Sequence, residues 1–176
     1  MNKVFKKYQN YFIPLVLILI VSFSRLVPHP YNFTPLIAMG IFAGFYFKQF
    51  YVSLFIVIFS MFIGDLFLGF HNTMFFTYIA LVVPIVFGIY AKHLKVSSIL
   101  ASSVISSISF FIITNFGAWL TLDMYEKNFT GLINSYVMAI PFFHNTIIST
   151  LFYLFLFKFL FDVLINKKKY LNLLLK

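Results

Sequence analysis

The sequence predicts an all-α integral membrane protein, and its composition and hydropathy are the main observations behind this prediction. Of the 176 residues, 62% are hydrophobic and only 10% are charged, whereas a soluble domain is about half apolar and about a quarter charged. Mean hydropathy is +0.98. The 27 Phe and 11 Tyr residues exclude a water-soluble core in a chain of this length. The absence of cysteine excludes disulfides and thiolate metal sites.

Six apolar stretches predict six transmembrane helices in a single domain, residues 1–176. The first stretch follows three lysines and precedes Arg25 without a small-residue cleavage site, so we interpret it as an uncleaved span rather than a signal peptide. The second stretch would be only about 20 Å long as a helix, which is shorter than the hydrocarbon core. The predicted spans cover residues 12–24, 34–47, 51–68, 73–91, 98–120 and 141–165.

Proline and polar residues indicate the ends of the later helices. Asn72 or Thr73 is expected to cap the fourth span, and Pro84 should kink that span because proline interrupts the helical hydrogen bonds. Pro141 is typical of a helix start and opens the sixth span. Between the fifth and sixth spans, the apolar segment 129–140 predicts a short helix that lies in the membrane interface or dips into it.

The distribution of lysine and arginine predicts the orientation of these helices. With a cytoplasmic N-terminus, only Arg25 and Lys127 of the 13 basic residues fall on the outer side. The cytoplasmic set is Lys3, Lys6, Lys7, Lys48, Lys92, Lys95, Lys158, Lys167, Lys168, Lys169 and Lys176. This positive-inside pattern predicts six spans with both termini in the cytoplasm. Because the basic residues are split among short loops, they favour orientation in a lipid bilayer over nucleic-acid binding, and no nucleic-acid partner is expected.

The connector between the first and second spans, Arg25–Pro35 (RLVPHPYNFTP), is the most unusual stretch of the chain. Pro28, Pro30 and Pro35 fix their own φ angles and disfavour helix at the preceding residue, so they predict a stiff, non-helical connector. It also carries a guanidinium, an imidazole and an amide beside an apolar span. Thr34 is predicted to be the N-cap of the second helix, with proline at its first position.

Four separate parts of the chain place polar side chains at the outer side of this topology. Ionisable groups within a membrane protein are costly and normally face the bundle interior or a wet cavity. We therefore expect these residues to line one pocket, open to the outside, that binds a small-molecule substrate. The predicted substrate-binding residues are Arg25, His29, Asn32, Asp65, His71, Asn115, Trp119, Tyr125, His144 and Asn145.

Several of these residues have a structural interpretation as well as a functional one. Asp65 lies near the C-terminal end of its helix, where the helix dipole disfavours a carboxylate, so we predict an ion pair with Arg25 that is either a clamp or a ligand contact. Asn115 and Trp119 are one turn apart and both suit ligand binding, although tryptophan is also a common membrane anchor. His144 follows a helix start whose free N–H groups suit an anionic group.

Metal binding and catalysis are not the preferred interpretations. His29, His71, His144 and Asp65 have the right donor atoms for a metal, but their spacing matches no known signature, so we expect no metal and no cofactor. His29 fits equally well as a locally bonded loop residue. The chain has no HExxH, GxSxG or glycine-rich phosphate loop, and it is predicted not to be an enzyme. An intramembrane acid–base enzyme and a structural subunit without a ligand are the alternatives.

Small residues on two spans predict close contacts between helices. Gly40 and Gly44 form a GxxxG pattern on the second span, which indicates a close helix contact within the chain or with a partner subunit. Ser102 and Ser106 share a face of the fifth span with two further serines. Small hydroxyl residues allow helices to approach closely in lipid, so this face is either a packing seam or the polar lining of a passage.

Four groups of short motifs occur between Arg25 and about Tyr153: RLVPHP with NFTP, DLFLGFH, TNFG with WL, and AIPFF with NT. In this order they resemble a family of uncharacterised bacterial membrane proteins described as transport proteins. That family is similar in architecture to the S components of energy-coupling-factor (ECF) transporters. The resemblance implies a six-helix bundle in the bacterial cytoplasmic membrane that carries a small molecule near its outer face. It also implies docking on an energising ATPase module. Nothing in this chain resembles an ATP site, so active transport would need a partner or an ion gradient.

Overall fold

The computed structural model describes residues 16–174, and over this range it contains helices and turns but no strand. Residues 16–24 are helical. The helices that follow are α2 (Leu36–Phe47), α3 (Phe50–Leu68), α4 (Met74–Ala80), α5 (Val82–Tyr90), α6 (Val96–Thr121), α7 (Phe129–Val137) and α8 (Ile140–Leu174). The prediction of an all-α chain is confirmed for this range.

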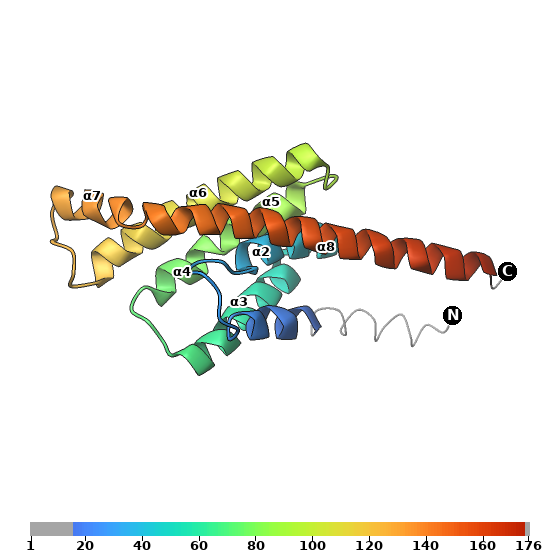
Figure 1. Ribbon diagram of the computed structural model, residues 1–176, viewed down its shortest axis with the longest axis horizontal. Helices are drawn as coiled ribbons and strands as arrows, with labels where there is room; N and C mark the ends of the chain where they lie inside the picture. Colours follow the sequence, from blue (N-terminus) through green and yellow to red (C-terminus); the bar gives the residue numbers. More distant parts are fainter. Residues whose placement is uncertain (1–15, 175–176) are drawn as a thin grey trace.

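Helix α2 lies at the centre of the bundle (Figure 1) and contacts α3, α5, α6 and α8. Its first nine residues, from Leu36 to Gly44, are all buried. A helix that is apolar on every side is typical of an interior position. This central position accounts for a helix of only 12 residues, because its neighbours and not lipid surround it. Around α2 the core is built from aliphatic residues of most helices, among them Val21, Ile56, Leu81, Ile85, Ile99 and Leu154.

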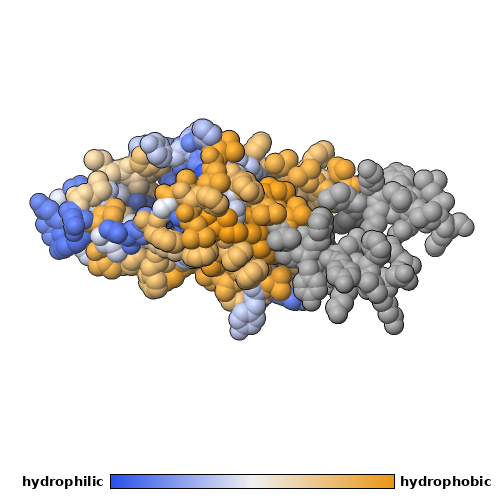
Figure 2. Space-filling model, turned by 90° about the horizontal axis from the view of Figure 1, so that it is seen from below, coloured by the Kyte–Doolittle hydropathy of each residue, from blue (hydrophilic) through white to orange (hydrophobic). Residues whose placement is uncertain are grey.

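Three helices are long and apolar enough to cross a membrane: Phe50–Leu68, Val96–Thr121 and the Ile140–Val163 part of α8. Figure 2 shows apolar residues across the middle of the molecule and hydrophilic residues at the end where α6 turns into α7. Many large apolar side chains in the middle are exposed, such as Phe55 at 57% and Ile112 at 50%, as expected of a surface that faces lipid. The predicted span 12–24 begins outside the described residues.

The predicted fourth span, residues 73–91, runs as two helices rather than one. Helix α4 ends at Ala80 and α5 begins at Val82, with Leu81 between them. Pro84 has no N–H, so the carbonyl of Ala80 loses its usual helical partner. The kink expected from Pro84 is therefore confirmed, and it falls at the turn before the proline. Thr73 is the N-cap, as predicted, but no side chain caps α4 with a hydrogen bond.

Apart from the C-terminal ends of α7 and α8, the other helix ends agree with the sequence to within two residues. The predicted Thr34 cap is wrong, since Pro35 is the N-cap of α2 and no side chain caps this helix. Helix α3 ends at Gly69, whose φ of 95° is a backbone conformation that suits glycine. Helix α7 confirms the predicted short helix. The predicted sixth span, 141–165, is part of the longer α8, which begins at Ile140 and continues to Leu174.

Helices α2 and α5 pack backbone against backbone, and glycines make this possible. A Cβ atom on Gly44 would lie 2.3 Å from the carbonyl oxygen of Ile85, and one on Gly88 would lie 2.0 Å from that of Ile41. A Cβ on Gly40 would lie 2.9 Å from the ring of Pro84. The close contact predicted from the GxxxG pattern is therefore confirmed, and α5 of the same chain makes it.

The serines of α6 form a buried face. Ser102 and Ser106 are buried, as are Ser103 and Ser107. Ser107 Oγ lies 3.3 Å from Thr150 Oγ1 of α8 and donates a hydrogen bond to it. The burial of these serines, with Ser107 at the contact between α6 and α8, agrees with the packing-seam interpretation.

Candidate functional site

A buried ion pair joins the end of the first helix to α3. Arg25 donates from Nη2 to Asp65 Oδ1 at 2.8 Å and from Nη1 to the carbonyl of Met61 at 2.7 Å. The side chain of Asp65 is 1% exposed and that of Arg25 is 11% exposed. Gly64 leaves room for the guanidinium, because a Cβ there would lie 2.3 Å from Nη1. The predicted Arg25–Asp65 pair is confirmed.

Tyr78 of α4 completes the environment of this carboxylate. Its hydroxyl donates to Asp65 Oδ2 at 2.8 Å, so each carboxylate oxygen accepts a hydrogen bond. A buried carboxylate needs such partners because an unpaired charge in an apolar interior is costly. Tyr78 is not among the site residues predicted from the sequence. It could have been found as the only tyrosine between Asp65 and the kink at Pro84.

The connector Arg25–Pro35 is held against α8. Asn145 Nδ2 donates to the carbonyl of Tyr31 at 3.0 Å, and the ring of Tyr31 packs edge-on against Phe142 with centroids 5.7 Å apart. Ser149 Oγ donates to the carbonyl of Asn32 at 3.4 Å. Asn32 has a φ of 61°, in the left-handed region that asparagine tolerates better than most residues. The connector is thus ordered by α8 as well as by its prolines.

A cavity of about 700 Å³ lies beneath this connector. Its wall is contributed by the connector, the start of α2, the end of α3, α4, α6 and the start of α8. Tyr31 is 78% exposed and Leu68 is 56% exposed, so two of the wall residues reach the surface of the molecule. The volume falls within the range of about 300–1,000 Å³ that is usual for small-molecule sites.

Five of the ten predicted substrate-binding residues line this cavity: Arg25, His29, Asn32, His71 and Asn115. His29 Nδ1 lies 2.8 Å from its neighbour's carbonyl, at Pro30, and His71 Nδ1 lies 2.8 Å from Thr73 Oγ1. Asn115 Nδ2 donates to the carbonyl of Phe111 at 2.8 Å. Each of these three side chains keeps a further polar atom that could bond a ligand.

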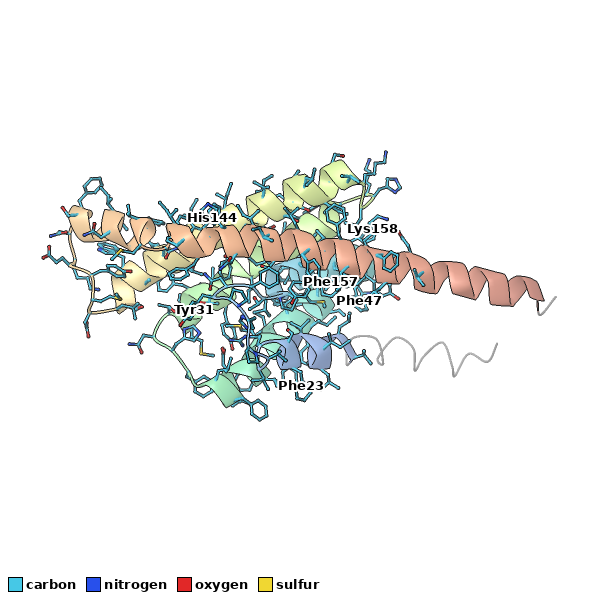
Figure 3. The ribbon with its side chains drawn as sticks, viewed as in Figure 1. Phe23, Tyr31, Phe47, His144, Phe157 and Lys158 are labelled. Carbon is cyan, nitrogen blue, oxygen red and sulfur yellow. The ribbon has the colours of Figure 1, made fainter. Side chains whose placement is uncertain are left out.

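The other five lie outside the cavity wall. Asp65 is enclosed behind Arg25, and Asn145 holds the connector. Trp119 Nε1 donates to the carbonyl of Glu126 at 3.0 Å and so braces the turn that follows α6, where Tyr125 also lies half-buried. His144 is exposed. Figure 3 shows it on the side of α8 away from Tyr31.

Hydroxyl groups in the wall are not among the predicted site residues; they belong to Thr34, Thr73, Thr77, Thr114, Thr146 and Ser149. Several of them, such as Thr77 and Thr114, donate to the carbonyl four residues earlier and keep their oxygen lone pairs. The spacing of Thr73 with Thr77, and of Thr146 with Ser149, was a detectable signal, because such pairs share a helix face. Aromatic rings of Tyr31, Phe110, Phe111 and Phe142 supply much of the apolar wall.

The chemistry of the wall is therefore one arginine, two imidazoles, two amides and several hydroxyls among apolar side chains. Among the residues that the structure describes, no aspartate or glutamate lines the cavity. Within residues 16–174, no three histidine, cysteine or acidic side chains come together as a set of metal ligands. Such a wall can donate and accept hydrogen bonds and can contact an apolar body.

Comparison with known proteins gives one family. A model described as a family of unknown function (DUF6580) matches residues 5–173. No curated protein and no solved structure matches the chain.

Proposed function

The chain belongs to a family of unknown function (DUF6580), and we propose from its cavity that it is a membrane protein that binds and transports a small molecule. The observation that carries this proposal is the cavity of about 700 Å³ whose wall includes five polar residues singled out by the sequence. These residues lie on three separate segments, which are the connector, the loop between α3 and α4, and α6. A structural subunit without a ligand would have no need of such a space.

The wall favours a neutral or anionic ligand over a cation. Arg25 and two histidines face the cavity, whereas no carboxylate of the described residues does. The carboxylate of Asp65 is already bonded by Arg25 and Tyr78. The bonds to Asp65 and to the carbonyl of Met61 fix the orientation of Arg25 and use two of its five N–H donors. The other three remain available. The aromatic side chains, among them Phe111, suit an apolar or planar ligand body.

We propose a six-span arrangement similar to that of ECF S components, with both termini in the cytoplasm. Beside the three long helices, this needs the α4–α5 pair, the central α2 and the first helix to traverse the bilayer. The distribution of charge supports it: Lys48, Lys95 and Lys158 lie near one end of the bundle, whereas Lys127 lies at the other. The cavity then faces the outside, and active transport takes its energy from a partner module or an ion gradient.

Binding is favoured over acid–base catalysis by the way the titratable groups are held. Within the part of the chain that the structure describes, no histidine is hydrogen-bonded to a carboxylate or to another histidine. His29 and His71 are bonded to a carbonyl and a threonine instead. A general acid–base mechanism needs two such groups within reach of one reacting atom.

Mass spectrometry of small molecules retained by the detergent-purified protein tests the proposal. We expect a specific compound in the wild-type protein and at least tenfold less of it in Asn115→Leu and His71→Leu. His144→Leu is the matched control, because this exposed histidine lies outside the cavity, and it should retain the compound. If wild type retains nothing above a blank, or if all variants retain equal amounts, the cavity is not a binding site.

A further inference from the structure

A second, smaller pocket of about 290 Å³ lies at the other end of α2, between α2, the α5–α6 connection and α8. Its wall, which we call the lysine pocket, consists of Phe45, His93, Leu94, Lys95, Lys158, Phe161 and Asp162. Figure 3 places Lys158 on α8 at this end, away from Tyr31 and the connector. The lysine pocket shares no lining residue with the cavity described above, and its chemistry is different.

Positive charge predominates around the lysine pocket. Lys95 and Lys158 line it, and Lys48 Nζ lies 4.8 Å from the ring centroid of Phe45, another wall residue. Lys48 also donates to the carbonyl of Ile89 at 2.9 Å, which fixes its ammonium at the end of α5. The single carboxylate of the wall, Asp162, is paired with Lys158. Within the described part of the chain, the charge of Lys95 therefore has no anionic partner in this pocket.

The N-terminus of α6 adds hydrogen-bond donors at the same place. Helix α6 begins at Val96 with Lys95 as its N-cap, and no side chain caps it. The first helical bond of the backbone runs from Ile99 N to the carbonyl of Lys95, at 2.9 Å. The N–H groups before Ile99 therefore remain available, and uncapped N–H groups at the start of a 26-residue helix attract anions.

Apolar surface continues from the lysine pocket along both helices that border it. Phe45 and Phe161 line the pocket itself. Beyond it, Val96 and Leu100 of α6 are 60% and 45% exposed, and Phe155 of α8, which shares a helix face with Lys158, is 38% exposed. A free phosphate ion would make no use of this surface, whereas the acyl chains of a lipid would cover it. Basic pockets at the ends of membrane helices are a known mode of binding for anionic headgroups.

We infer that the lysine pocket binds the phosphate of an anionic phospholipid, with Lys95, Lys158 and the start of α6 around the headgroup and the acyl chains along α6 and α8. This inference is independent of the ligand of the larger cavity. It assigns the bound lipid to the leaflet at the lysine-pocket end. The lipid would also link α8 to the α5–α6 connection.

Native mass spectrometry and thermal unfolding of the delipidated full-length protein test the inference. Phosphatidylglycerol, phosphatidylcholine and inorganic phosphate are added separately at equal concentrations. We expect phosphatidylglycerol alone to remain bound and to raise the melting temperature. Each of Lys95→Ala and Lys158→Ala should weaken its binding about fivefold, because a lysine near an anionic lipid contributes about 1 kcal/mol.

Two further variants make the result specific. Lys92→Ala removes an exposed lysine from the same connection but outside the pocket wall, so its affinity should match that of wild type. Lys95→Arg keeps the charge and should keep the affinity, even if the alanine variant folds poorly. Equal binding of both lipids, or equal weakening by Lys92→Ala and Lys95→Ala, would overturn the inference. Equal protection by inorganic phosphate would show an anion site without lipid specificity and would overturn the lipid assignment.

Discussion

The start of α2 and the rest of this helix pack in opposite ways. In the middle and second half of the helix, Gly40 and Gly44 lie against α5 so closely that almost no space is left. At its start, Leu36 and Ile37 are buried too, yet they border a cavity of about 700 Å³. One short helix thus supports both a close backbone contact with α5 and one side of the 700 Å³ cavity.

The difference follows from what faces each end. Opposite Gly44 is another glycine, Gly88, so the two backbones approach until a Cβ on either residue would overlap a carbonyl oxygen of the other helix. Opposite the start of α2 lies a connector whose prolines prevent helix formation and whose polar groups must be bonded. Its arginine is held by Asp65, and its carbonyls by Asn145 and Ser149. Close packing of two helix backbones leaves no cavity between them. The non-helical connector, held by hydrogen bonds at several points, instead covers a cavity.

Removing Asp65 should lower the free energy of unfolding most, because its carboxylate holds Arg25 and so the connector end of the bundle. Asp65→Ala leaves the guanidinium of Arg25 buried without a counter-charge, and breaking a buried pair costs about 3–5 kcal/mol. We expect that loss in the free energy of unfolding, measured with denaturant in mixed micelles. The double variant Arg25→Met with Asp65→Leu should be more stable than either single change, because no lone charge is left.

The matched control for this variant is the exposed pair of α8. Asp162 and Lys158 are 49% and 33% exposed, and an exposed pair of this spacing contributes only about 0.5 kcal/mol or less. Asp162→Ala should therefore leave the unfolding free energy almost unchanged. A loss for Asp65→Ala as small as that for Asp162→Ala would show that the buried pair does not hold the connector end.

The packed end can be tested by adding single methyl groups. Gly88→Ala places a Cβ 2.0 Å from a backbone oxygen, whereas Gly40→Ala meets the ring of Pro84 at 2.9 Å. We expect Gly88→Ala to cost about 1–3 kcal/mol, as overpacking does, and Gly40→Ala to cost less because a side chain can shift. Thermal unfolding in detergent gives the order. Ala101→Leu, on the exposed face of α6, is the control and should be tolerated; if it destabilises as much, close packing of α2 on α5 is not the cause.

Sequence patterns predicted the packed end better than the hollow one. The pair Gly40 and Gly44 predicted a close contact because a glycine leaves room for a neighbouring backbone whichever helix lies beside it. The partner could not be predicted, since Gly88 is a single glycine in another helix and forms no pattern by itself. The break between α4 and α5 was foreseen from Pro84 because the missing N–H acts locally.

At the site, charge was a more reliable guide than position along the helix axis. Arg25 and Asp65 were predicted to pair because each is the obvious counter-charge for the other. His144 was predicted to face the same pocket, but membrane depth does not specify which side of a helix a residue occupies. Its neighbour Asn145 faces the connector while His144 is exposed. Hydroxyl residues were missed because threonine and serine are common in helices of every kind.

The smallest effect should come from the seam between α6 and α8, which runs from the packed end towards the cavity. Ser107 Oγ donates to Thr150 Oγ1 at 3.3 Å, and hydrogen bonds between membrane helices average about 0.6 kcal/mol. Ser107→Ala should lower the unfolding free energy by about that amount, and a double-mutant cycle with Thr150→Val should give a coupling of the same size. Ser109→Ala, whose hydroxyl bonds its own helix at Ile105, should show no coupling to Thr150. Because the two helices also touch through buried side chains beside this pair, strictly additive losses would mean that shape alone, without the hydroxyl bond, aligns α6 with α8.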